Sequence, residues 1–406
     1  MAGTSYAYKV RTAQGRTLEG KMEADGEGMV ASRLRKQGFV PISISKDSKV
    51  SMKAELHILP QRVTLSDLAI FSRQFATMIS SGLSLIRTLN ILAEQSENTK
   101  LAETIGLLRN DVEQGSSLSA GMSKYPKVFS TLFVSMVRAG ETGGQLETVL
   151  QRLANSFEAD YKLRRKIKSA MTYPVMVSGI AGLLVGIMLI FVVPTFAGMF
   201  DDLGGELPLP TKILLAMSQQ ATILVPVGIV AAVVGFFAYK KARKTNAAFR
   251  LRADKTRLKI PVFGDLFLKI AVSRFVRTLA LLLRAGVPVL QALDIVAETT
   301  GNEVLARAAI DVRESVKSGE SMSEPLGAHK VFPPMVVQMI AVGEDTGQLD
   351  EMLDKVGDFY DQEVESTTES LTAMIEPIMI AVLGGIVGAM VIALYMPMFK
   401  IFELIK

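Results

Sequence analysis

The chain of 406 residues contains no cysteine and only two histidines, His57 and His329. The absence of cysteine excludes disulfides, iron–sulfur clusters, thiolate zinc sites and cysteine nucleophiles. Charged residues make up only 21% of the chain, whereas 49% is hydrophobic and the mean hydropathy is +0.32. The chain is too apolar for one soluble domain and too charged to lie wholly in lipid. This composition favours two or three folded units, some of them in a membrane.

Three long runs of 32, 27 and 23 residues contain no charged residue, at 169–200, 213–239 and 377–399. A bilayer core of about 30 Å needs roughly 20 apolar residues in a helix, so each run is long enough to cross it. A buried core helix is the alternative, but such helices are rarely uncharged over this length. We predict membrane spans over 172–199, 212–239 and 374–400.

Basic residues mark one end of two of these spans. They precede the first span and follow the second: Lys162, Arg164, Arg165, Lys166, Lys168, Lys240, Lys241, Arg243, Lys244, Arg250 and Arg252. Lysine and arginine near span ends remain on the cytoplasmic side. We therefore expect a multi-pass protein of the plasma (inner) membrane with a cytoplasmic N-terminus, an external loop at 200–211 and a short external tail at 401–406.

The net charge of +5 is concentrated at these inner flanks. Such clusters attract anionic headgroups, so membrane lipid is an expected partner. The sequence lacks a groove-reading motif and an aromatic platform, which argues against nucleic acid as a partner.

The chain repeats itself at a spacing of about 204 residues, so that 71–200 aligns with 275–402. A repeat this long indicates a domain duplication. The most similar segments are Gly140-Glu-Thr-Gly-Gly-Gln-Leu146 and Gly343-Glu-Asp-Thr-Gly-Gln-Leu349. We take eight positions of these segments as a structural or partner-binding motif: Gly140, Glu141, Gly144, Leu146, Gly343, Glu344, Gly347 and Leu349.

Both copies have the pattern of helical domains. Apolar residues in 65–80 and 274–284 recur at spacings of three and four, and the glycines at 82 and 286 are typical of helix ends. We predict a mainly α fold with two duplicated cytoplasmic six-helix bundles, at 61–170 and 240–373. Each bundle precedes a span, and the span at 212–239 lets both copies share one orientation.

The N-terminal residues differ from the rest. Alternating residues in 6–13 and 17–23, with a turn at 14–16, predict a hairpin. A helix near 25–37 and a strand at 39–45 complete a small ββαβ module over 1–45. The polar segment 46–60 is predicted to be a linker.

The segment that begins at Gly140 resembles a phosphate loop but lacks the Gly-Lys-Ser/Thr ending and follows no strand. A helix–helix turn, in which Glu141 or Glu344 accepts hydrogen bonds from backbone amides, is the favoured interpretation.

Glu94 and Glu141 recur in the second copy as Glu298 and Glu344. If the helices that carry them are adjacent, their oxygens could bind a hard cation such as calcium. The alternative is that they lie at solvated helix ends. No other cofactor is indicated.

No charged residue lies inside the predicted spans, and Lys212, Glu376 and Lys400 lie at their boundaries. Transporters and channels normally place such groups within the membrane. Their absence argues against a three-span transporter or channel component, which is therefore only the second hypothesis. A membrane-tethered enzyme is disfavoured by the missing catalytic motifs. Glycines at 179, 182 and 186, and at 384, 385 and 388, are typical of close helix–helix packing.

The duplicated Gly-Glu-x-x-Gly-x-Leu motif, the Tyr173-Pro174 and Glu376-Pro377 pairs and the N-terminal Tyr6-x-Tyr8 signature occur in one order. In this order the chain resembles the type II secretion system F family, the GspF/PilC family of inner-membrane platform proteins. The resemblance covers nearly the whole chain.

The resemblance implies a non-enzymatic scaffold of a type IV pilus or type II secretion machine. Implied partners are a hexameric secretion or pilus ATPase, pilin or pseudopilin subunits and other inner-membrane assembly proteins, and we expect a homo-oligomer. It also implies a cation site in the first helical domain, for which Glu94 and Glu141 are the candidates. A retractile pilus, a DNA-uptake pilus and a secretion pseudopilus all fit.

The absence of cysteine provides a test of the topology. A single cysteine introduced at Leu207 should react with a membrane-impermeant maleimide only from the external side, because 200–211 connects the first two spans. Labelling only from the cytoplasm would contradict the predicted orientation.

Overall fold

The computed structural model describes residues 4–11, 17–24, 26–36, 38–46, 62–201 and 208–404. It divides into two compact units, one containing residues 1–62 and 98–100 and the other containing 63–97 and 101–406. His57, the predicted turn at 14–16, most of the predicted linker and Leu207 lie outside the described residues.

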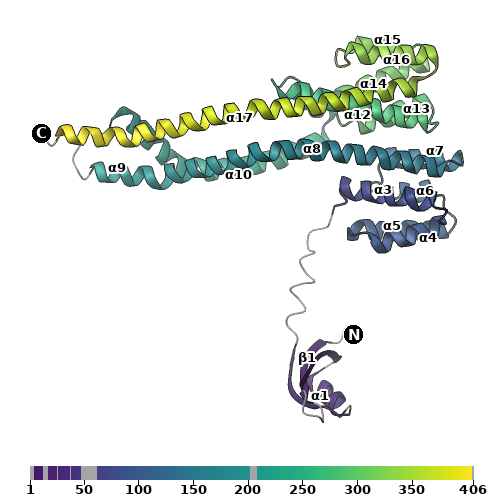
Figure 1. The fold of residues 1–406 in the computed structure, drawn as a ribbon, viewed down its shortest axis with the longest axis horizontal. Coiled ribbons are helices and arrows are strands. Elements are labelled where there is room, and N and C mark those ends of the chain that lie inside the picture. The colour runs from purple at the N-terminus through teal and green to yellow at the C-terminus, as the bar shows by residue number, and fades with distance from the viewer. Residues whose placement is uncertain are drawn as a thin grey trace. The chain divides into compact units, whose positions relative to one another are not determined.

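The chain is mainly helical (Figure 1). In the first unit the elements are β1 (Thr4–Arg11), β2 (Thr17–Ala24), α1 (Glu27–Lys36) and β3 (Val40–Lys46). The first copy of the repeat contains α3 (Leu65–Ser80), α4 (Leu85–Gln95), α5 (Thr99–Glu113), α6 (Leu118–Ser123), α7 (Thr131–Thr142) and α8 (Leu146–Ile187). Then follow η1 (Met188–Val192), α9 (Val193–Asp201), α10 (Leu209–Thr245) and α11 (Ala247–Leu258). The second copy contains α12 (Phe263–Arg284), α13 (Val289–Thr299), α14 (Glu303–Lys317), α15 (Ser323–Ala328), α16 (Pro334–Thr346) and α17 (Leu349–Leu404).

The N-terminal unit is a three-stranded antiparallel sheet in the order β2-β1-β3, with α1 packed against it. Tyr6 and Val10 of β1 and Val30 and Leu34 of α1 are buried in its core. Because β1 alternates its side chains between the two faces of the sheet, residues four apart share the face that α1 covers.

The two copies in the second unit build their cores from corresponding aromatic residues. Phe71 and Phe129 have ring centroids 5.8 Å apart, and their counterparts in the repeat, Phe275 and Phe332, are 4.9 Å apart. All four rings are buried within one apolar cluster. Such pairs are worth about 0.5–1.5 kcal/mol beyond the area they bury, so the duplication preserves a stabilising contact and not only a sequence pattern.

The copies also share an ion pair between their first and last helices. Arg73 of α3 donates to Glu158 of α8 at 2.6 and 2.8 Å, and the corresponding Arg277 of α12 lies 2.5 Å from Asp361 of α17. The hydrogen bond from Arg73 holds the pKa of Glu158 below its ordinary value of 4.5. Each pair connects the start of a bundle to the helix that leads towards the membrane.

Among the described residues, three helices are long and apolar enough to cross a membrane. The helix α8 has 42 residues and α17 has 56, which correspond to roughly 60 and 80 Å at 1.5 Å per residue. A bilayer core accounts for about 30 Å of that length, so the rest of each helix belongs to its helical domain. The two helices pack against one another (Figure 1).

The helices α9, α10 and α17 meet at a small apolar cluster in which Val193, Leu214 and Met390, one from each, are buried. Thr211 of α10 donates to the backbone oxygen of Ala393 in α17 at 2.6 Å, and Ser218 donates to that of Leu189 in η1. The π-helical turn η1 departs from regular α pairing, and a hydroxyl donor to its carbonyl satisfies a polar group within the apolar region.

Within the described helices, the span glycines do not pack closely against a neighbouring helix, so our expectation for them is wrong within one subunit. A Cβ placed at Gly179, Gly182 or Gly186 of α8, or at Gly384, Gly385 or Gly388 of α17, would meet nothing within 4 Å. None of the most apolar stretch of α8 is buried. The spans instead meet through the larger residues near Val193, so these glycine faces are directed away from the chain's own helices.

We predict that the Arg73–Glu158 pair makes the first copy sensitive to acid. Because the pKa of Glu158 is lowered in the folded state, the contribution of the pair is present above about pH 4.5 and is lost as the pH falls through the lower folded-state pKa. Glu158→Gln should remove about 0.5–1 kcal/mol at pH 7, a value typical of partly exposed pairs, and much less at pH 3. Hydrogen exchange of α3 at both pH values measures this difference.

Glu97→Gln provides the matched control, because Glu97 is an exposed carboxylate in the same copy. An equal effect of both substitutions at pH 7, or a Glu158→Gln effect that persists unchanged at pH 3, would contradict the role of the ion pair.

Candidate functional site at the duplicated Gly-Glu turns

The motif forms a tight turn between two helices in each copy. In the first, a Cβ at Gly140 would lie 3.1 Å from the Cα of Leu146, and in the second a Cβ at Gly343 would lie 2.8 Å from the Cα of Leu349. A real Cβ atom essentially never lies within 3.0 Å of a neighbour, so a side chain at Gly343 would force the backbone to move. The first glycine of the motif therefore permits close contact between α7 and α8, and between α16 and α17.

The second glycine ends the preceding helix. Gly144 and Gly347 have φ angles of +65° and +69°, which glycine adopts without strain. Gln145 donates its backbone N–H to Gly140 at 2.8 Å, and Gln348 donates to Gly343 at 3.0 Å. These are the bonds from the sixth residue to the first that define a Schellman motif. Leu146 and Leu349 then begin the next helix and pack against the core.

The glutamate of the motif caps a different helix. The carboxylate of Glu141 accepts hydrogen bonds from the backbone N–H groups of Leu118 at 2.5 Å and Ser119 at 3.0 Å. Ser117 accepts the next amide, that of Ala120, at 3.2 Å. The first amides of α6, which have no partner within their own helix, are thus satisfied by one carboxylate and one hydroxyl.

The second copy repeats this cap. Glu344 accepts from the backbone N–H groups of Met322 at 2.7 Å and Ser323 at 3.2 Å, at the start of α15. The hydroxyl of Ser321 also donates to it at 2.5 Å. The two copies differ at Thr142-Gly143 and Asp345-Thr346, but the glutamate performs the same task in both.

The proposed cation ligands have separate partners. Glu94 is exposed on α4 and accepts a hydrogen bond from Asn90 at 2.9 Å, whereas Glu141 binds the start of α6. In the described part of the chain, no group of three or more His, Cys, Asp or Glu residues has the arrangement of a metal site. Calcium binding by Glu94 and Glu141 stays a prediction, which a calcium titration of the whole chain would test.

The sequence does not identify the amides that donate hydrogen bonds to Glu141 and Glu344. They lie in Gly115-Ser-Ser-Leu-Ser119 and Gly319-Glu-Ser-Met-Ser323, segments that are themselves duplicated. These segments precede the Gly-Glu motif at nearly the same distance in both copies. Two segments that recur together at a similar spacing are candidates for direct contact.

Comparison with known proteins agrees with this duplicated architecture. The model of "Type II secretion system (T2SS), protein F" matches residues 71–194 and again 275–397. The model of the N-terminal domain of the same protein matches residues 1–45. The chain belongs to the type II secretion system protein F family. Its two matched segments each begin in the first helix of a copy and end within an apolar run.

Curated members of the family are similar over nearly their full length. A type IV pilus assembly protein PilC of Thermus thermophilus is 45% identical over 98% of both chains. A PilC protein of Myxococcus xanthus is 41% identical over 98% of this chain and 95% of its own. The type II secretion system protein F of Vibrio cholerae is 33% identical over 89% of this chain and 90% of its own. With its three apolar helices, this member of the family is a membrane protein.

We predict that Glu141→Ala weakens α6 locally. Two helix-start amides lose their acceptor, which costs about 1–2 kcal/mol and corresponds to about 5- to 30-fold faster amide exchange. Hydrogen exchange measured by mass spectrometry should show this acceleration in 117–123 and little change in 321–328.

Glu344→Ala is the matched reciprocal variant and should accelerate exchange in 321–328 only. Uniform acceleration in both copies, or none in either, would contradict the capping role.

Proposed function

We propose that this chain is an inner-membrane platform of a type IV pilus or type II secretion machine. In this proposal its N-terminus is cytoplasmic, and two helical bundles of six helices each lie in the cytoplasm. The bundles receive movement from a hexameric ATPase and transmit it to pilin or pseudopilin subunits in the membrane. The names of the relatives, which include pilus assembly and secretion proteins, support this assignment.

The observation that carries the proposal is the continuity of α8 and α17. Each begins at a duplicated Gly-Glu turn and continues without a break from its bundle into an apolar run. A continuous helix transmits displacement along its axis because its turns are hydrogen-bonded to one another. In α8 one such bond is missing at Pro174, which has no N–H to donate. The chain therefore has two stiff connections between its charged domains and the region suited to lipid.

A second apolar cluster joins these helices just before the apolar runs begin. Leu266 of α12 and Val364 and Leu371 of α17 are buried there, and Leu163 and Ile167 of α8 pack against them. Lys166 of α8 also pairs with Glu365 of α17. These contacts support movement of the two helices as one body at the membrane boundary.

A structural role for the motif supports a scaffold over an enzyme. Both oxygens of Glu141 and Glu344 are engaged by backbone amides, and the glycines serve turn geometry. The uncovered glycine faces of α8 and α17 provide surface for other subunits. We propose that they contact a second copy of the chain or a pilin helix, which is consistent with a homo-oligomeric platform.

We predict that softening α8 at the membrane boundary uncouples the platform. Replacing residues 170–173 by four glycines keeps the length and register of the helix but lowers its stability by roughly 1 kcal/mol per residue relative to alanine. Pilus or pseudopilus assembly should be lost in a strain that depends on this chain, while co-purification of the partner ATPase is retained.

Replacement of the same four residues by alanine is the matched control and should preserve both assembly and ATPase binding. Normal assembly with four glycines, at equal membrane levels of the protein, would show that rigid transmission through α8 is not required. Failure of either variant to co-purify the ATPase would contradict the platform assignment.

A further inference from the structure

A cavity of about 750 Å³ lies where α10 leaves its apolar stretch. Its walls come from the end of α10, from α11 and from the helix pair α13 and α14, all in the second compact unit. On α10 it is lined by two aromatic residues, Phe236 and Tyr239, followed by Lys240, Arg243 and Lys244. The order along the helix runs from apolar through aromatic to basic.

This position corresponds to the headgroup level of a membrane. The uncharged run on α10 ends at residue 239, and Lys240 is its first charge. Tyrosine and tryptophan are enriched at this level because they are apolar at one end and polar at the other, which fits Tyr239, whereas Phe236 is wholly apolar. Lys240 lies 5.9 Å from the centroid of the Phe236 ring, and Arg257 lies 5.7 Å from that of Tyr239. Both are cation–π contacts between the aromatic rings and neighbouring basic residues.

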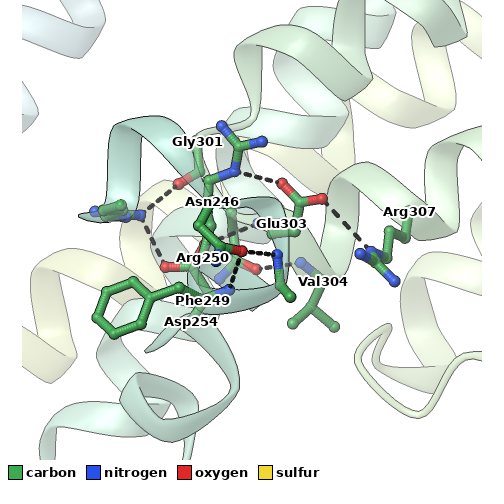
Figure 2. Close-up of polar contacts among 11 residues, drawn as sticks. Asn246, Phe249, Arg250, Asp254, Gly301, Glu303, Val304 and Arg307 are labelled. Atoms are coloured by element: carbon green, nitrogen blue, oxygen red, sulfur yellow. Dashed lines mark hydrogen bonds and ion pairs between the residues drawn. The ribbon is translucent and has the colours of Figure 1, made fainter. Parts of the chain in front are cut away.

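A buried carboxylate fixes one of the arginines of the cavity. Asp254 of α11 is only 2% exposed and accepts hydrogen bonds from Nη2 of Arg243 at 2.8 Å and from the backbone N–H of Glu303 at 2.9 Å. Figure 2 shows Asp254 among these donors at the start of α14. The N-cap Asn246 accepts from the amides of Ala248 and Phe249, which turns the chain from α10 into α11.

A second arginine is held by an ion pair. Nε of Arg250 lies 2.8 Å from Oε2 of Glu303, whose other oxygen faces Arg307 (Figure 2). Each guanidinium has five N–H donors. Within the described ranges, these contacts engage only Nη2 of Arg243 and Nε of Arg250, so the other donors of both remain for a ligand.

The charge around the cavity is positive. Six cations lie on or next to its wall: Lys240, Arg243, Lys244, Arg250, Arg257 and Arg307. Three carboxylates oppose them, namely Asp254, Glu298 and Glu303. Lys244 is exposed and forms no ion pair within the described part of the chain. A ligand that neutralises this surplus must be an anion.

We infer that this cavity binds the headgroup of one anionic phospholipid, with the phosphodiester against the arginines and lysines and the acyl chains along the apolar surface of α10. Arginine suits phosphate because its planar donors engage two oxygens together, and basic cavities beside cytoplasmic span ends are typical headgroup sites. The inference rests on the proposed crossing of the membrane by α10 with Lys240 at its cytoplasmic end.

The test uses the full chain in detergent, titrated with dioleoyl phosphatidylglycerol or dioleoyl phosphatidylcholine and followed by native mass spectrometry. One phosphatidylglycerol should be retained in preference to phosphatidylcholine. Lys240→Gln with Lys244→Gln should weaken that retention by about 30-fold, the value for two surface cations. Neither lysine donates a hydrogen bond to another residue that the structure describes, and circular dichroism verifies that the variant folds.

Arg165→Gln with Lys168→Gln is the matched control. It removes two exposed cations that precede the uncharged run of α8 and that do not line this cavity, and should leave the preferential retention intact. An equal loss of phosphatidylglycerol retention in both variants would show that general surface charge causes the retention, and would contradict a specific site. Displacement of the lipid by millimolar sodium phosphate would overturn the lipid assignment in favour of free phosphate.

A second measurement locates the ligand. Ala306 lines the cavity, and the chain contains no cysteine, so Ala306→Cys carries a single thiol. Its maleimide labelling should slow with phosphatidylglycerol and not with phosphatidylcholine; equal rates would overturn the inference. Neither readout involves the ATPase or filament assembly, so failure of the lipid site and failure of the platform proposal are distinguishable.

Discussion

The structure depends on one constraint, namely that the last helix of each copy also carries a run long and apolar enough to cross a membrane. Within the hydrocarbon core the backbone must satisfy its own hydrogen bonds, and a single helix does so without outside partners. The same helix must pack against a bundle in water, where one face is apolar and the other charged. The helices α8 and α17 meet both demands by changing composition along their length. The basic or acidic surface of the domain portion gives way to an uncharged run at residue 169 and residue 377.

The other repeated contacts follow from that arrangement. The ion pairs Arg73–Glu158 and Arg277–Asp361 hold the domain portion of each long helix against the first helix of its bundle. The Gly-Glu turn fixes where the long helix begins, since Gly140 and Gly343 admit the first turn of the next helix at close range. Glu141 and Glu344 then connect that corner to a short helix more than twenty residues earlier in the chain. In each copy the long helix is therefore held to the other helices at its start, by the Gly-Glu turn, and farther along, by the ion pair.

Much of this organisation could be predicted from the sequence because it depends on local composition or on repetition. Uncharged runs mark the spans, and the repeat marks the two copies. The glycines at 82 and 286 mark helix ends, and both have positive φ angles in the structure. What could not be predicted depends on which distant groups meet. The sequence shows that Glu141 recurs as Glu344 but not that the partners are the amides of α6 and α15. Glycines within spans indicate that close packing is possible, yet they do not say whether the partner belongs to the same chain.

The basic residues that flank the first two uncharged runs illustrate the same limit. Topology requires only that lysine and arginine lie near a span end, and Arg165 and Lys168 of α8 satisfy that requirement while exposed to solvent. At the end of α10 the arrangement goes further, because Asp254 is almost fully buried to hold Arg243. Burying a carboxylate costs several kcal/mol unless charge and hydrogen bonds compensate, and orientation in the membrane gains nothing from it. The buried ion pair and the hydrogen bond from the backbone N–H of Glu303 instead fix the geometry of a cationic surface. A bound anion needs such fixed geometry, whereas the orientation of a span needs only the charge.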